Sequence, residues 1–275
     1  MYIAPARSAG MVFAGAEFGA RPEGGKRLPQ SNFVPLPATV DEARVVSESM
    51  GITESAVFTG ARATEAALRG VAGPRVLHIA SHGFFERGTG GDGLDPLLDS
   101  GLALSGVNAR TPETNSAADG LLTAMDVVGL DLVGTELAVL SACETGVGTM
   151  TAGQGVYGMR RALSMAGSQS QLLSLWQVDD DSTAALFSAL YRRLAAGEGR
   201  SAALQSVQVA LLDGRLTPPA DYTARSRGSV VESGLPTEAY PGWTHPYFWA
   251  AFTLSGAGGP LSTGSSDAAL VNVAE

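Results

Sequence analysis

Two residues in this sequence have types and neighbours suited to nucleophilic chemistry. Cys143, the only cysteine, follows directly after the apolar run LAVLSA, and His82 follows the run PRVLHIAS. A cysteine attacks as its thiolate, which needs a base to accept the proton and a nearby positive charge, and an imidazole can supply both. The sequence therefore predicts a His82–Cys143 dyad, provided that the fold brings the two runs together.

The two runs are expected to be buried strands, over 74–83 and 135–142, because they are nearly uninterrupted in apolar residues. Strands and helices alternate along the chain, which is typical of an α/β fold with a mostly parallel sheet covered on both faces. In such a sheet, sites form beyond the carboxyl ends of the strands. The other predicted strands cover 10–15, 55–60, 100–106, 170–176 and 247–256, and the predicted helices cover 39–51, 61–70, 121–132, 153–167, 180–197 and 199–214.

Residues beside the dyad are expected to assist it. The backbone amides of Gly83 and Cys143 are the candidate oxyanion donors, since glycine allows a close approach. His78, four residues before His82, is interpreted as a core histidine with satisfied hydrogen bonds or as one that supports His82 from behind, and Glu144 as a neighbour of the dyad that bonds to a nearby loop rather than a third member of a triad.

Composition excludes several kinds of partner. The net charge is −9 and the basic residues are scattered, so nothing would neutralise a row of phosphates and no nucleic-acid partner is expected. A single cysteine forms no internal disulfide, which favours the cytoplasm. No run approaches the ~20 apolar residues of a membrane span. Three histidines and one cysteine offer no ligand cluster, so neither a metal nor a cofactor is expected.

The wider pattern carries a resemblance to a known family. The segments VLHIASHGFF, DGLLTAMDV, LAVLSACETGVG and HPYFWAAFTLSG, in this order, closely resemble the CHAT domain, a caspase and separase relative among the clan CD cysteine proteases. The histidine precedes the cysteine, as it does in caspases and unlike the papain-type order. The resemblance covers roughly residues 10–256 and implies a caspase-hemoglobinase-like three-layer α/β/α sandwich with a mostly parallel central sheet. One protease domain over 1–256 and a disordered tail over 257–275 are expected.

The resemblance also implies a function. It indicates a cysteine-type endopeptidase, a thiol protease, in which His82 and Cys143 form the dyad and cleave protein substrates. A prokaryotic defence or stress pathway is the implied setting, with an upstream activating protease or a sensor protein as a further partner. Arginines in the loops 86–120 and 214–243 are candidate processing sites.

Three acids, Asp179, Asp180 and Asp181, follow the predicted strand 170–176, and two interpretations of them stay open. Acids at a helix N-terminus satisfy free amides, and this accounts for at least one of them. In the resembling family this segment lines the substrate cleft, which makes Asp180 or Asp179 a candidate partner for an arginine or lysine before the scissile bond. Trp176 and Gln177 would then form part of the pocket wall.

Two other functions remain open on the sequence. The first is a catalytically silent caspase-like scaffold whose active edge binds partner proteins, which a thiol-reactive peptide probe would distinguish. The second is a cysteine-dependent amidase or transferase. Such enzymes place the nucleophile on a Gly-x-Cys-x-Gly elbow, whereas this chain reads Ser-Ala-Cys-Glu-Thr over 141–145.

Overall fold

A six-stranded sheet forms the centre of the molecule in the computed structural model, which describes residues 4–20, 32–85, 95–111, 119–142, 154–176, 178–217 and 242–263. The strand order is β2-β1-β3-β7-β8-β9, and only β9 runs antiparallel to its neighbour. The strands are β1 (Met11–Ala16), β2 (Val57–Gly60), β3 (Val76–Ala80), β7 (Leu137–Ser141), β8 (Ser170–Ser174) and β9 (Phe252–Gly256). The predicted mostly parallel sheet is therefore confirmed.

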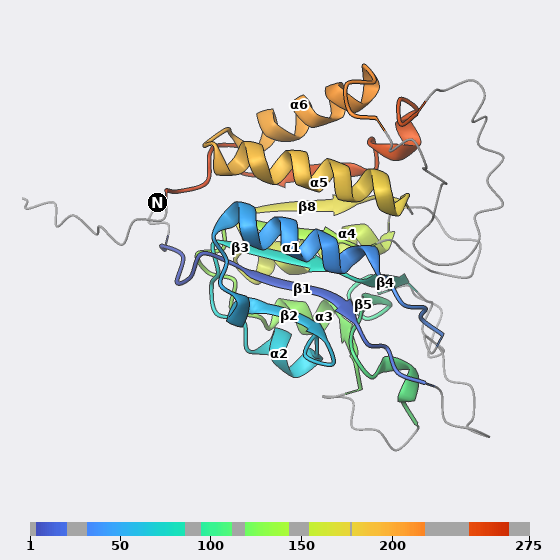
Figure 1. Cartoon of the computed structure of the whole chain (residues 1–275). Helices are drawn as coiled ribbons and strands as arrows, with labels where there is room; N and C mark the ends of the chain where they lie inside the picture. Colours follow the sequence, from blue (N-terminus) through green and yellow to red (C-terminus); the bar gives the residue numbers. More distant parts are fainter. Residues whose placement is uncertain are drawn as a thin grey trace, which may run out of the picture.

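Helices cover both faces of this sheet (Figure 1). One face packs against α1 (Ala38–Met50), α5 (Asp180–Ala195) and α6 (Arg200–Leu212), and its core includes Val12, Val139 and Phe187. The other face packs against α2 (Glu65–Arg69), α3 (Ala124–Val128) and α4 (Gln154–Met165), around Phe13, Ile79 and Leu140. Alternate residues of the central strands enter opposite cores, as a strand buried on both faces requires. The fold is the predicted three-layer α/β/α sandwich.

A second, antiparallel sheet was not foreseen in the sequence. It consists of β4 (His82–Phe85), β5 (Ser100–Ala103) and β6 (Leu121–Thr123), in that order. The predicted strand 74–83 thus divides at Ser81, whose backbone N–H still bonds to Ser141 of β7 while its hydroxyl donates to Ala103 of β5. His82 consequently begins the small sheet instead of ending the large one.

The end of α1 matches the sequence prediction, and the starts of α1 and α2 differ from it. Gly51 ends α1 in the left-handed conformation, with φ +64°, as expected of a C-terminal glycine. Helix α1 begins at Ala38, one residue before the predicted start, and the Thr39 hydroxyl donates to the Leu36 carbonyl and accepts from the Gly15 amide. Helix α2 begins at Glu65 rather than at 61, because the Thr64 side chain caps it by accepting from Ala67.

Ion pairs link helix α2 to helix α3, which follows the small sheet. Thr123 and Asp126 form a reciprocal capping box at the start of α3, and Arg69 of α2 pairs with both Asp126 and the buried Glu65. Burial raises the pKa of the Asp126 carboxyl, but hydrogen bonds from Thr123 and Arg69 outweigh it and hold the pKa below its ordinary value. Burial raises the pKa of Glu65. These contacts tie α2 to the helix that follows the small sheet.

The predicted disordered tail, 257–275, is corrected at its beginning. Residues 257–263 cross the amino edge of the large sheet, where the Ser262 N–H donates to the Glu136 carboxylate at 2.7 Å and the Ser262 carbonyl accepts from Arg75 at 2.6 Å. Leu261 is buried, and the buried Arg200 donates to the Gly259 carbonyl at 2.8 Å. This short segment is therefore part of the packed domain, and residues 264–275 lie outside the described residues.

Candidate functional site

Strands β3 and β7, which precede the two predicted catalytic residues in the sequence, lie in register. The strands are parallel neighbours, Ala80 pairs with Ser141, and the Ser81 N–H bonds to the Ser141 carbonyl at 3.3 Å. His82 and Cys143 each stand two residues beyond this last pair along the chain. Cys143 itself, with Glu144, lies outside the described residues. The strands thus direct both chain segments to the same edge of the sheet, at the same level.

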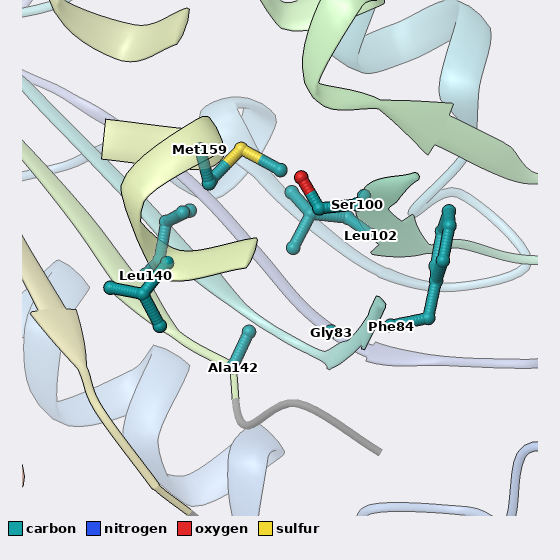
Figure 2. A pocket seen from close by; sticks show the side chains of 9 residues that line it. Gly83, Phe84, Ser100, Leu102, Leu140, Ala142 and Met159 are labelled. Atoms are coloured by element: carbon teal, nitrogen blue, oxygen red, sulfur yellow. The ribbon is translucent and has the colours of Figure 1, made fainter. Parts of the chain in front are cut away.

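A small hollow lies between these two segments (Figure 2). Ala142, the residue before Cys143, and Gly83, the residue after His82, both line it. Its volume is about 30 Å³, with a mainly apolar wall. That is the room of one or two water molecules, too little for a substrate side chain. The hollow therefore marks the point where the two segments face each other, and it is not a substrate pocket.

The His82 ring is held from three sides. Only 3% of the residue is exposed, and the ring centroid lies 5.2 Å from that of Phe18 and 5.4 Å from that of Phe33. Its Nε2 lies 2.8 Å from the Val34 carbonyl oxygen. A carbonyl oxygen only accepts, so Nε2 donates in this bond, and in the neutral ring the basic lone pair is on Nδ1. This tautomer suits a general base that acts through Nδ1.

His78 lies deeper, in the layer between the sheet and its helices. Its ring nitrogens bond to the Tyr191 hydroxyl of α5, at 2.8 Å, and to the Glu42 carboxylate of α1, at 2.9 Å. All three side chains are buried. Burial and, secondarily, the Glu42 charge raise the pKa of Tyr191 well above its ordinary value. These contacts join β3 to α1 and α5, so any effect of His78 on the site would act through the placement of α1.

Of the three consecutive acids 179–181, one caps a helix. Asp179 is the N-cap of α5: its buried carboxylate accepts from the Ser182 amide at 2.9 Å. This confirms the helix-capping interpretation for one acid, and it corrects the assignment of Asp179 to the substrate pocket, because a buried cap is not presented to a substrate. The side chain of Asp180 and all of Gln177 lie outside the described residues. Trp176 is 37% exposed, and its indole N–H donates to the Tyr247 carbonyl at 3.1 Å.

The residues that hold the His82 ring could not be predicted from the sequence. Phe18, Phe33 and Val34 come from segments that precede His82 by dozens of positions, and no local pattern links them to it. The oxyanion role of the Gly83 amide stays a prediction. Within the described segments, no group of three or more histidines, cysteines or carboxylates is placed to bind a metal ion. No helix in those segments is long and apolar enough to cross a membrane.

Comparison with known proteins agrees with the resemblance drawn from the motifs. The chain is 28% identical over 253 residues to tetratricopeptide repeat protein 28 of Homo sapiens, an alignment that covers 84% of this chain and 9% of that protein. The chain thus spans less than a tenth of the length of that relative. The family model of the CHAT domain matches residues 3–257, which include nearly all of the described fold. On this match the chain belongs to the CHAT domain family, a caspase-like, protease-related group.

Proposed function

We propose that this CHAT domain is a cysteine endopeptidase in which His82 activates Cys143. The observation that carries the proposal is the register of β3 and β7, which sends His82 and the segment before Cys143 to one edge of the sheet. The tautomer imposed by the Val34 carbonyl supports it, because it leaves Nδ1 as the basic atom. The family match supports it at the level of a protease-related domain.

The proposed reaction uses these groups in order. Nδ1 of His82 takes the proton of the Cys143 thiol, and the thiolate attacks the carbonyl carbon of the scissile peptide bond. The backbone amides of Gly83 and Cys143 stabilise the negative oxygen. The imidazolium then returns its proton to the leaving amine, and the C–N bond breaks to give a thioester. Water, deprotonated by the same imidazole, hydrolyses the thioester and restores the thiol.

A thiol-reactive peptide probe tests the proposal against the silent scaffold. We expect covalent labelling of Cys143, readable by intact mass, in the unaltered chain and none in Cys143→Ala. His82→Gln should lower the labelling rate by about 10²–10⁴-fold, the usual contribution of a general base. His245→Gln is the matched control, since His245 caps the 3₁₀ helix Pro246–Phe248 at the end of a different segment. Equal labelling of the His82 and His245 variants would reject the dyad.

The proposed substrate preference is for arginine or lysine before the scissile bond, and after the correction above it depends on Asp180. A charge-assisted pair with a guanidinium is stronger than a neutral hydrogen bond. We expect Asp180→Asn to reduce kcat/KM for fluorogenic arginine peptides by at least tenfold. Asp181→Asn, the adjacent acid of the same helix, is the control and should leave kcat/KM unchanged. Efficient cleavage after aspartate but not after arginine would reject the preference.

The silent scaffold remains the second candidate, and one observation favours it. The exposed fraction of His82 is only 3%, and a fold retained for binding alone could bury this ring in the same way. Failure of the probe to label Cys143 in a folded chain would support this alternative. The cytoplasmic location, the role in prokaryotic defence and activation by an upstream protease or a sensor remain proposals as well. Intact-mass analysis during incubation would test processing at Arg110 or Arg215.

A further inference from the structure

We propose that Asn108 is a positioning residue for His82, because it fixes the segment whose carbonyl sets the tautomer of the catalytic ring. Asn108 belongs to the 3₁₀ turn Val107–Ala109, which follows the small sheet strand β5. The inference rests on the proposed function, since it assigns a role in preparing the same base. Its test has a readout that does not need protease activity.

Asn108 bonds to both sides of the His82 enclosure. Its side-chain oxygen accepts from the Phe33 N–H at 2.9 Å, and its side-chain nitrogen donates to the Phe33 carbonyl at 2.8 Å and to the Gly19 carbonyl at 3.1 Å. Its backbone N–H donates to the Phe18 carbonyl at 2.8 Å. Phe18 and Phe33 are the two aromatic residues whose rings pack against His82. One residue thus joins the two aromatic walls of the site.

The segment that Asn108 holds cannot be fixed by a sheet. Val34 lies between Phe33 and Pro35, and Pro37 follows, so two of the residues that precede α1 carry no backbone N–H. A residue before proline is also driven to an extended backbone. The Asn108 amide therefore takes the place of a neighbouring strand and pairs with both backbone groups of Phe33.

The consequence for His82 follows from the chain connection. The Val34 carbonyl, which accepts from Nε2 at 2.8 Å, belongs to the residue directly after Phe33. A shift of about 1 Å would break a bond of this length. The main chain of His82 is fixed separately, by the pairing of His82 with Ala103 of β5. Loss of the Asn108 side chain should therefore release the tautomer of the ring while leaving the strand in place.

Two substitutions separate the bonds from the volume of the side chain. Asn108→Asp keeps the size and the oxygen that accepts from Phe33, but a carboxylate cannot donate to the Phe33 and Gly19 carbonyls. Asn108→Ala removes all three side-chain bonds and leaves the backbone bond to Phe18. Both variants should weaken the hold on Val34, the second more than the first.

The test reads the histidine rings directly by NMR. In ¹⁵N-histidine-labelled protein carrying Cys143→Ala, we expect His82 to be the Nε2–H tautomer, with assignment by His82→Gln. Each Asn108 variant should turn the His82 signals into a mixture of tautomers, while the signals of His78 and His245 stay unchanged. In chains that retain Cys143, kcat should fall by about 10²-fold with little change in KM, the size expected for a misplaced catalytic group.

Each outcome decides the inference. Unchanged His82 signals in folded Asn108 variants would overturn it, even if the chain proves to be a protease. Tautomer mixing without any protease activity would support the positioning role and reject the proposed function. If both variants fail to fold, the chain with Asn108 still decides: a His82 ring found as the Nδ1–H tautomer overturns the inference, and the Nε2–H tautomer supports it.

Discussion

Removing the Tyr191 hydroxyl should make the domain less stable at neutral pH but less sensitive to alkali. Tyr191 is fully buried, and its hydroxyl lies 2.8 Å from Nδ1 of His78. A net hydrogen bond stabilises by about 1 kcal/mol, and a buried polar atom left without its partner costs about 1–3 kcal/mol. We therefore expect Tyr191→Phe to lower the free energy of unfolding at pH 8 by about 1–3 kcal/mol.

At high pH the Tyr191 hydroxyl has the opposite effect: its ionisation lowers the free energy of unfolding. Burial raises the pKa of Tyr191 in the folded chain well above its ordinary value of about 10. Between the two pKa values the folded chain holds one proton more than the unfolded chain, so stability falls as pH rises. The stabilisation is complete below pH 10. By pH 11 the unaltered chain should have lost about 1.4 kcal/mol that Tyr191→Phe does not lose, because the variant has no phenol at this position.

Urea unfolding at several pH values between 8 and 11 measures both effects. The matched control is Tyr157→Phe, since Tyr157 is 62% exposed and its loss should reproduce the curve of the unaltered chain. The deficit of Tyr191→Phe should shrink steadily above pH 10. Parallel curves for the unaltered chain and Tyr191→Phe up to pH 11 would refute the argument, because they would show that the phenol ionises equally well in the folded and unfolded chains.

Three further changes test the packing of the domain. Gly101→Ala should cost about 1–3 kcal/mol in urea unfolding, since the new Cβ would overlap the Leu122 carbonyl oxygen, whereas Gly259→Ala meets no atom within 4 Å and should be neutral. Asp126→Asn should cost about 1 kcal/mol at pH 7 and progressively less as pH falls below about 4, because the lowered pKa of Asp126 stabilises only while the unfolded carboxyl is ionised. Truncation after Gly256 should lower Tm by several degrees relative to truncation after residue 263, through loss of the contacts at the amino edge; equal Tm values would contradict the packing of 257–263.

The large sheet could be predicted because its signals are local. Strands β7 and β8 are short apolar runs with a helix on either side in the sequence, and both lie within two residues of their predicted starts. In the small sheet only β5 gave such a signal, within the predicted strand 100–106; β4 was merged into the predicted strand 74–83, and β6 fell in the predicted helix 121–132. Its strands have three or four residues, and each pairs with a partner across a long polar segment. Pairing of this kind depends on tertiary contacts, which a single sequence does not display.

The site shows the same limit at the scale of single residues. The dyad could be proposed from residue type and strand position, but the groups that hold the ring are two phenylalanines and the Val34 carbonyl, and nothing in the sequence links them to His82. The acids show the reverse case: Asp179 has a residue type that suggests binding, yet its carboxylate serves the helix. Residue type predicts which groups can react. It does not predict which groups are already engaged by the backbone.

The division of the predicted strand at Ser81 explains how this fold can hold a basic histidine next to a rigid sheet. If β3 continued through 82, the ring would follow the alternation of Val76, His78 and Ala80 and enter the core below α1 and α5. Instead, Ser81 keeps its backbone bond to β7 and sends its hydroxyl to Ala103, so the chain leaves the large sheet at the level of Ser141. The His82 ring then gains its partners from Phe18, in the segment after β1, and from Phe33 and Val34, in the segment before α1. The main chain of His82 is thus held by its pairing with Ala103 of the small sheet, and the proposed tautomer is set by the loops, which is why Asn108 is expected to alter the second without altering the first.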